Sequence, residues 1–109
     1  MPIVITDTAI GTGTASAGAV TINKIYGRAT TESYTTVAGG SEILQINNTF
    51  ASVGDVVLTN VYGAPGAGSP VISSVSCIGG AIILIIHNVH LSAAFSGVYI
   101  VNFVIFKAS

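Results

Sequence analysis

Charged residues are the scarcest class in this chain of 109 residues. Three are basic and four are acidic, 6% of the total, whereas roughly 25 % of a typical soluble domain is charged. The formal net charge of −1 excludes the basic surface that nucleic-acid binders use. A surface with so little charge indicates that neighbouring subunits cover part of it, in an obligate oligomer or a lattice. The alternative is a neutral monomer rich in serine and threonine.

Cysteine is almost absent, and long apolar runs are missing. Cys77 is the single cysteine, so no intrachain disulfide can form, and its apolar neighbours predict a buried thiol. The apolar runs 78–86 and 98–106 are shorter than the roughly 20 residues of a spanning helix. Residues 1–7 lack the basic and apolar regions of a signal peptide. We therefore expect no membrane partner, and assembly in a reducing host cytoplasm.

Strong helix formers are also scarce, while β-branched residues and glycine dominate. Short strand-like runs are separated by turn signals, a pattern typical of a sandwich or barrel. We expect an all-β, antiparallel, jelly-roll-like β-sandwich of seven or eight strands, with an open barrel as the alternative. The expected strands are Ala19–Tyr26, Ala29–Val37, Glu42–Asn47, Asp55–Tyr62, Val71–Ile78, Ala81–His87 and Val98–Phe106, with Ile3–Thr6 as a possible eighth.

The breaks between these runs have identifiable chemistry. Gly79-Gly80 lies between two apolar runs, as a two-residue hairpin turn would. Residues 63–70 are rich in Gly and Pro and predict an exposed loop. Residues 7–18 are small and have little to bury, so they predict an extended or weakly ordered segment. The chain is accordingly divided into an N-terminal arm, residues 1–18, and a β-sandwich domain, residues 19–109.

Two of the expected strands are apolar at nearly every position. Successive side chains of a strand point to opposite faces, so the runs 81–86 and 98–106 would be buried on both. In an antiparallel sandwich one face normally meets water, and a symmetric partner is the simplest cover for the second. We predict a homotrimer with these strands at or near its threefold axis, with a dimer or a hexamer as the alternatives. The expected interface residues are Ile83, Ile85, Ile100, Phe103 and Ile105.

Three short motifs suggest ligand sites, and each has a plainer explanation. Gly11-Thr12-Gly13 resembles part of a dinucleotide fingerprint, but no helix is expected after it, so a flexible arm is favoured. His87 and His90 could form a metal-binding ring on a threefold axis, but no acidic or cysteine ligand is close in sequence. Asn47-Asn48-Thr49 matches a glycosylation sequon, which we interpret as a turn after a strand. We expect no cofactor and no metal.

Catalytic arrangements are equally poorly supported. Glu32 and Glu42 could form a carboxylate pair, but aromatic residues are sparse and tryptophan is absent. We interpret both as strand-edge charges that limit aggregation. A Ser-His-Asp site would have to use Asp7 or Asp55, and no G-x-S-x-G pattern accompanies either. We expect that the protein is not an enzyme and has no catalytic residues.

A series of short segments points to a family. These segments are Ile25–Thr30, Asn47–Thr49, Asp55–Asn60, Val71–Ser76 and Val98–Phe106. The series resembles small trimeric β-sandwich modules of tailed-phage virion proteins, both head decorations and fibre domains. Such modules carry a G-x-A/V-T strand, an N-T-x-V/F turn, a strand ending in Leu-Thr and an apolar last strand. The resemblance spans residues 25–106 and brings no catalytic residue with it.

The expected function is therefore structural. We predict a capsid decoration or cement protein of a bacteriophage, a trimer that binds the major capsid protein on the outer surface of the virion. A tail-fibre or receptor-binding tip is the alternative, and a small hydrolase is the third candidate. Decoration is favoured because Met1 is followed by a compact module without coiled-coil heptads. In the arm, Ile3, Val4 and Ile5 are expected to add as a strand to an exposed sheet edge of the capsid or of the adjacent protomer. The alternative for this segment is a disordered tail.

Overall fold

The structure, a computed structural model, describes residues 11–64 and 68–106, and within them the chain forms nine strands and no helix. The strands are β1 (Gly11–Thr14), β2 (Ala19–Thr21), β3 (Tyr26–Thr30), β4 (Tyr34–Thr36), β5 (Ser41–Asn47), β6 (Val56–Ala64), β7 (Pro70–Ile78), β8 (Ala81–Asn88) and β9 (Phe95–Phe106). The expected all-β class is confirmed. Nine strands are present where seven or eight were expected.

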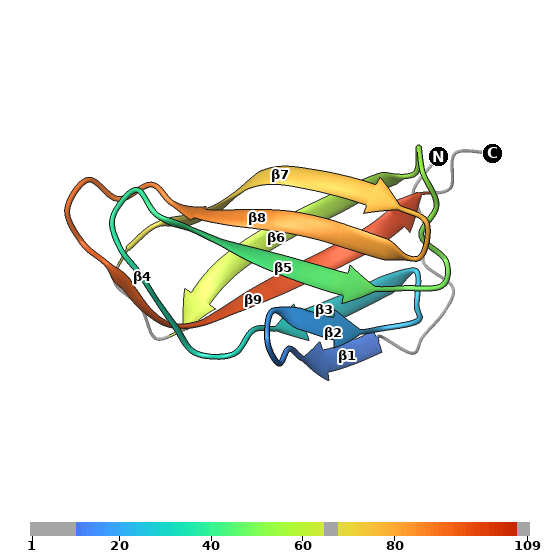
Figure 1. Cartoon of the computed structure of the whole chain (residues 1–109), viewed down its shortest axis with the longest axis horizontal. Helices are drawn as coiled ribbons and strands as arrows, with labels where there is room; N and C mark the ends of the chain where they lie inside the picture. Colours follow the sequence, from blue (N-terminus) through green and yellow to red (C-terminus); the bar gives the residue numbers. More distant parts are fainter. Residues whose placement is uncertain (1–10, 65–67, 107–109) are drawn as a thin grey trace, which may run out of the picture.

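The strands form two packed sheets in a β-sandwich-like arrangement. Sheet 1 contains β1, β3, β9, β4 and β6, and sheet 2 has the order β2-β5-β8-β7. The long β9 is the centre of sheet 1, because β3 and β6 both pair with it in antiparallel fashion. In Figure 1, β5, β7 and β8 cross over β6 and β9. The sheets are mixed rather than purely antiparallel, since β1 pairs with β3 and β2 with β5 in parallel.

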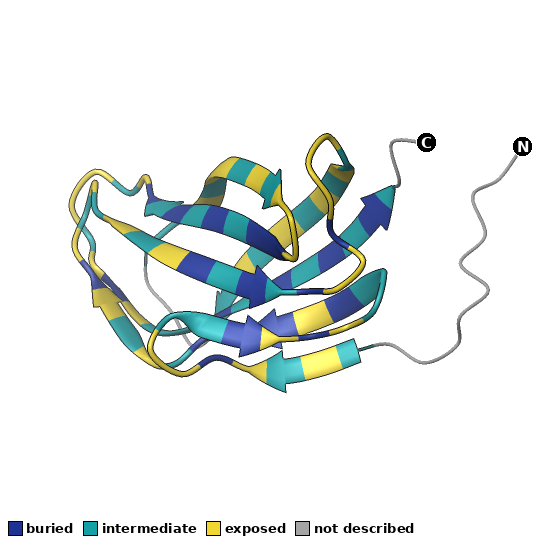
Figure 2. Cartoon of the chain, turned by 45° about the vertical axis from the view of Figure 1, so that its right-hand side comes forward, coloured by how far each residue is buried: buried dark blue, intermediate teal, exposed yellow. Residues whose placement is uncertain are grey.

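The core lies between the two sheets and is filled by alternate residues of the central strands (Figure 2). In β8 these are Ile82, Leu84 and Ile86, all 0% exposed. In β9 they are Tyr99, Val101, Phe103 and Ile105, each at most 4% exposed. The intervening residues of both strands face outward and are only partly buried. Each apolar strand thus has one face in the core and one on the surface of the protomer.

The segment expected as an arm is partly built into the sandwich. Gly11–Thr14 forms β1, and Ala15, 4% exposed, belongs to the core. Glycine permits this packing, because a Cβ at Gly11 would lie 2.5 Å from Ile22 Cγ2 and one at Gly13 would lie 2.6 Å from Val20 Cγ2. The expectation of an extended or weakly ordered arm over residues 7–18 is therefore not confirmed, because residues 11–15 pack into the sandwich. Residues 1–10 lie outside the described part of the chain.

Two other expected strands are each divided into two segments. Ala19–Tyr26 begins with β2 in sheet 2, and the chain then crosses to sheet 1, where β3 begins at Tyr26. Ala29–Val37 contains the end of β3 and all of β4, and both of these strands pair with β9 in sheet 1. The hairpin at Gly79-Gly80 is confirmed: Ile78 pairs with Ala81, and Gly80 has φ 87°, a conformation that favours glycine.

Candidate interaction surface

The outer face of sheet 1 is broad and almost uncharged. The strand register places residues of β3, β9 and β6 side by side, and each such set forms a row across the face. In the order β3, β9, β6 the rows are Tyr26, Val104 and Leu58; Arg28, Asn102 and Asn60; and Thr30, Ile100 and Tyr62, with the β9–β6 pair Phe106 and Val56 at the end. Leu58 is 56% exposed, Val56 57% and Tyr62 45%. Among the described residues of these rows, Arg28 carries the one formal charge. Exposed apolar side chains gathered on one strand face make this face a candidate interaction surface.

A polar row crosses this apolar face at its middle. The Arg28 Nε–H donates to Asn102 Oδ1 at 2.9 Å, and the Asn102 Nδ2–H donates to Asn60 Oδ1 at 2.9 Å. The three side chains come from β3, β9 and β6, neighbours in the sheet. These bonds hold the two amides in fixed orientations. Arg28 itself is exposed, and its other guanidinium nitrogens lie beyond the Nε that makes the bond. The row therefore gives the face a fixed polar pattern that a partner would have to match.

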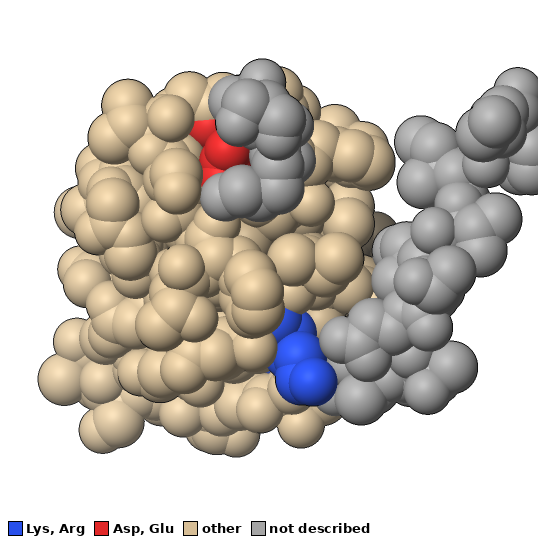
Figure 3. Space-filling view, turned by 90° about the vertical axis from the view of Figure 1, so that its right-hand side faces the viewer, with Lys and Arg blue, Asp and Glu red and all other residues tan. Residues whose placement is uncertain are grey.

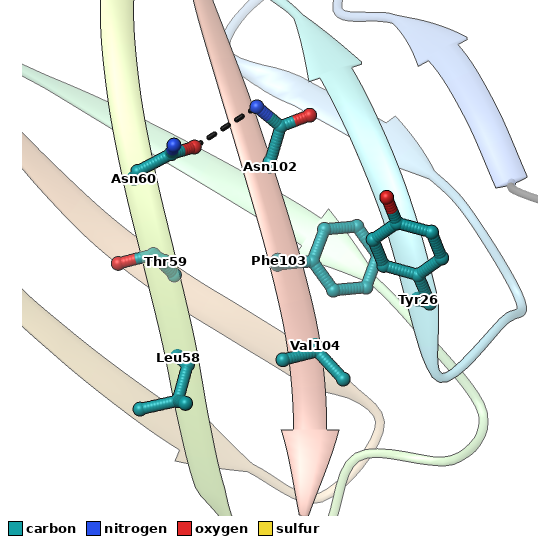
Figure 4. A pocket seen from close by; sticks show the side chains of 7 residues that line it. All are labelled: Tyr26, Leu58, Thr59, Asn60, Asn102, Phe103 and Val104. Atoms are coloured by element: carbon teal, nitrogen blue, oxygen red, sulfur yellow. Dashed lines mark hydrogen bonds between the residues drawn. The ribbon is translucent and has the colours of Figure 1, made fainter. Parts of the chain in front are cut away.

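A shallow pocket lies on the same face, beside the polar row. Its volume is about 280 Å³, and it is lined by Tyr26, Leu58, Thr59, Asn60, Asn102, Phe103 and Val104. Figure 4 shows the Leu58 and Val104 side chains below the hydrogen-bonded pair Asn60–Asn102, with the Tyr26 ring on the β3 side. The pocket is thus apolar at one end and offers amide groups at the other. We call it the sheet 1 pocket.

A second exposed apolar feature is the loop from Val89 to Ala94, which joins β8 to β9. Leu91 is 98% exposed and Val89 49%. The loop is nevertheless fixed by hydrogen bonds: His90 Nδ1 accepts the Ser92 N–H at 3.1 Å and the Ala93 N–H at 2.8 Å. We call residues 89–94 the Leu91 loop.

Asn88 anchors this loop to its neighbours and is itself 0% exposed. Its Nδ2 donates to the carbonyls of Thr36 at 3.1 Å and Ala93 at 3.0 Å, and lies 3.4 Å from that of Val37. Its Oδ1 accepts the N–H groups of Ser69 at 3.0 Å and His90 at 3.2 Å. One amide therefore joins three loops at this end of the sandwich.

At the opposite end Asn48 has a similar role. It is 1% exposed, and its Nδ2 donates to the Lys24 carbonyl while its Oδ1 accepts the Phe50 N–H. The motif at residues 47–49 is thus a turn at the end of β5, as expected.

Seen from the end at which β9 terminates, the drawn surface is mostly uncharged, with one blue and one red area (Figure 3).

The predicted interface residues are not brought together. Ile100 lies on the outer face of sheet 1, whereas Ile83 and Ile85 lie on the outer face of sheet 2. Phe103 and Ile105 are 1% and 4% exposed and belong to the protomer's own core. Buried side chains of this kind contribute mainly to folding, and of the two only Phe103 also lines the sheet 1 pocket. The arm residues Ile3, Val4 and Ile5 lie outside the described residues.

The candidate ligand and catalytic residues are likewise separated. His87 lies beside the Ser41 hydroxyl, Nδ1 to Oγ 3.3 Å, while His90 caps the Leu91 loop. In residues 11–64 and 68–106 no cluster of three His, Cys, Asp or Glu side chains could hold a metal ion.

Within the same residues no helix has the length and apolar character needed to cross a membrane. Cys77 is partly buried and packs against the core.

Glu32 and Glu42 have separate structural partners. The Glu32 carboxylate accepts the N–H groups of Gly18 at 2.8 Å and Ala17 at 2.9 Å and the Tyr34 hydroxyl at 3.0 Å. The Gly18 bond is the main cause that lowers the pKa of Glu32. Burial, and then the Glu32 partner, raise the pKa of Tyr34 to about 12. Glu42 accepts the Thr36 hydroxyl at 2.9 Å.

The sequence did not single out the polar row or the Leu91 loop. A signal for the row existed, because Asn60 and Asn102 each interrupt an apolar strand run at a position where asparagine is unfavourable. The register that pairs them was needed to recognise a shared site. Leu91 had no comparable signal, since one leucine in a loop gives no information about exposure.

Comparison of the chain with protein-family models, with curated proteins and with solved structures finds no match.

Proposed function

We propose that the protein is a structural component of a bacteriophage virion, a homotrimer of jelly-roll-like subunits that decorates and stabilises the capsid. The observation that carries this proposal is the outer face of sheet 1, where exposed Val56, Leu58 and Tyr62 lie in a nearly uncharged surface. The resemblance of residues 25–106 to trimeric virion modules supplies the biological setting. A chain with 6% charged residues suits a protein whose faces are covered by neighbours.

The energetics favour association through this face. Burial of about 400 Å² of apolar surface per subunit would contribute on the order of 10 kcal/mol before association costs are subtracted. The Arg28–Asn102–Asn60 row would give that contact direction, because its polar groups must be matched when water is removed. In this proposal Ile100 contributes from the outer face, whereas Phe103 and Ile105 support it from the core.

Attachment to the capsid is assigned to the N-terminal segment that precedes β1. Ile3, Val4 and Ile5 would add as a strand to a sheet edge of the major capsid protein, so that main-chain hydrogen bonds provide the affinity. Three such segments per trimer would make attachment multivalent. Because few charges take part, binding should depend little on salt.

The proposal is tested by two measurements on the purified full chain. Light scattering should give three times the chain mass of 10.9 kDa, and the trimer should co-sediment with capsids stripped of decoration. Deletion of residues 2–10, which leaves β1 intact, should preserve the trimer and abolish co-sedimentation. A monomeric wild type, or undiminished capsid binding after the deletion, would contradict the proposal.

A receptor-binding tip of a tail fibre is the second candidate, and the sheet 1 pocket is the observation that favours it. Tyr26, Asn60 and Asn102 place an aromatic ring and two amides around about 280 Å³, and pockets with a few oriented polar groups suit small polar ligands. Binding of the trimer to host cells, but not to capsids, would favour this candidate. Binding to capsids and not to cells would favour decoration.

A further inference from the structure

The Leu91 loop and the sheet 1 pocket are complementary in chemistry. Leu91 is 98% exposed on a loop whose backbone is held by His90 and Asn88, so an aliphatic side chain projects from an ordered backbone. The pocket, about 280 Å³, has Leu58 and Val104 at its apolar end and room for a side chain of this size. Neither the loop nor the pocket lining carries a charged side chain, and Arg28 is bonded to Asn102 at the polar end of the pocket. Insertion of Leu91 at the apolar end, between Leu58 and Val104, therefore requires no charge to be desolvated.

The two features cannot meet within one protomer. The Leu91 loop ends just before Phe95, the first residue of β9, whereas the pocket lies at residues 102–104 of the same strand. Nine residues of strand separate Phe95 from Val104, or about 30 Å at the usual rise per residue. The long β9 in Figure 1 keeps these places apart. An occupant from this chain must therefore come from a second copy.

We propose that Leu91 of one copy inserts into the sheet 1 pocket of the next. The contact is heterologous, because two different surfaces meet, and such a contact closes into a ring when the rotation between copies permits. A threefold ring would use every loop and every pocket, which defines the geometry of the homotrimer. This inference rests on the proposed trimer and specifies how its subunits contact one another.

Within this contact His90 is a positioning residue. Its Nδ1 accepts the Ser92 and Ala93 N–H groups and so fixes the backbone on either side of Leu91. Asparagine can accept bonds from the N–H groups two and three residues later in a similar way. His90→Asn should therefore retain the wild-type mass, whereas His90→Ala should weaken the trimer by raising the entropic cost of ordering the loop.

Paired cysteines, introduced in a Cys77→Ala background that removes the native thiol, test the contact directly. The double variant Leu91→Cys, Leu58→Cys should form disulfide-linked dimers and trimers on mild oxidation, visible on a non-reducing gel. Each single variant should stay unlinked, because the bond needs a thiol at position 91 of one copy and another at position 58 of the next. The pair Val53→Cys, Leu58→Cys is the control, since Val53 is 77% exposed but lies on the loop that precedes β6. Linking of this control to the same extent would show non-specific collision and overturn the inference.

Charge substitution separates this inference from the proposed function. Leu91→Asp should give a folded monomer, while Val53→Asp should remain trimeric. A trimeric Leu91→Asp protein would overturn the loop contact and leave the proposed trimer standing. If that trimer had lost capsid binding, the loop would be assigned to the capsid instead of a second copy. A monomeric wild type would overturn both proposals.

Discussion

Replacement of Asn88 by alanine should be among the most destabilising changes in the protein. Its side chain makes four hydrogen bonds of 3.2 Å or shorter, to Thr36, Ala93, Ser69 and His90. At about 1 kcal/mol net for each bond, Asn88→Ala should cost about 4 kcal/mol. That is a large part of the roughly 5–15 kcal/mol that stabilises a typical domain.

Thermal unfolding followed by circular dichroism measures this effect. A loss of about 4 kcal/mol corresponds to a decrease in Tm on the order of 20 °C for a domain of this size. Asn23→Ala is the matched control, because exposed Asn23 makes one hydrogen bond through its side chain, accepting the Thr49 N–H at 3.0 Å. The control should lose about 1 kcal/mol or less. An Asn88→Ala protein as stable as Asn23→Ala, at the same protein concentration, would refute the reasoning.

Three further predictions concern local interactions. The Gly18 N–H lowers the pKa of Glu32 below 4.5, so the stability that this carboxylate contributes is present above pH 4.5 and is lost as pH falls through the lowered pKa. Glu32→Gln should therefore reduce the dependence of the unfolding free energy on pH in that acid range. Because the pKa of Tyr34 is raised to about 12, its stabilisation should be complete below pH 10 and lost as pH rises through about 12. An absorbance titration of Tyr34→Phe should lack the step near pH 12. Gly13→Val should cost about 1–3 kcal/mol in urea unfolding, since even its Cβ would crowd Val20 at 2.6 Å; wild-type stability would contradict the packing of β1.

The sequence predicted the long strands better than the short ones. Residues 81–86 and 98–106 are nearly continuous apolar runs, and their strand character follows from composition alone. β1, by contrast, is Gly-Thr-Gly-Thr, a segment with no hydrophobic period. It forms because parallel pairing with β3 and the small glycines allow close packing, and both depend on residues distant in sequence.

The candidate surface required the register as well. An apolar run such as 98–106 does not reveal which alternate set of side chains faces the core. The structure places Phe103 inside and Ile100 outside, because the even-numbered residues of β9 align with the exposed positions of β6. The row Arg28–Asn102–Asn60 exists only once three strands are aligned, so the separate sequence positions could not identify it.

The central claim is that subunits associate through the outer face of sheet 1, and the mass of two charge variants tests it most directly. Leu58 is 56% exposed on that face, and Ile43 is 60% exposed on the outer face of sheet 2. Both tolerate a charge without burying it in the core, so both variants should fold. Light scattering should show monomers near 10.9 kDa for Leu58→Asp and trimers for Ile43→Asp. Trimeric Leu58→Asp together with monomeric Ile43→Asp would contradict the account.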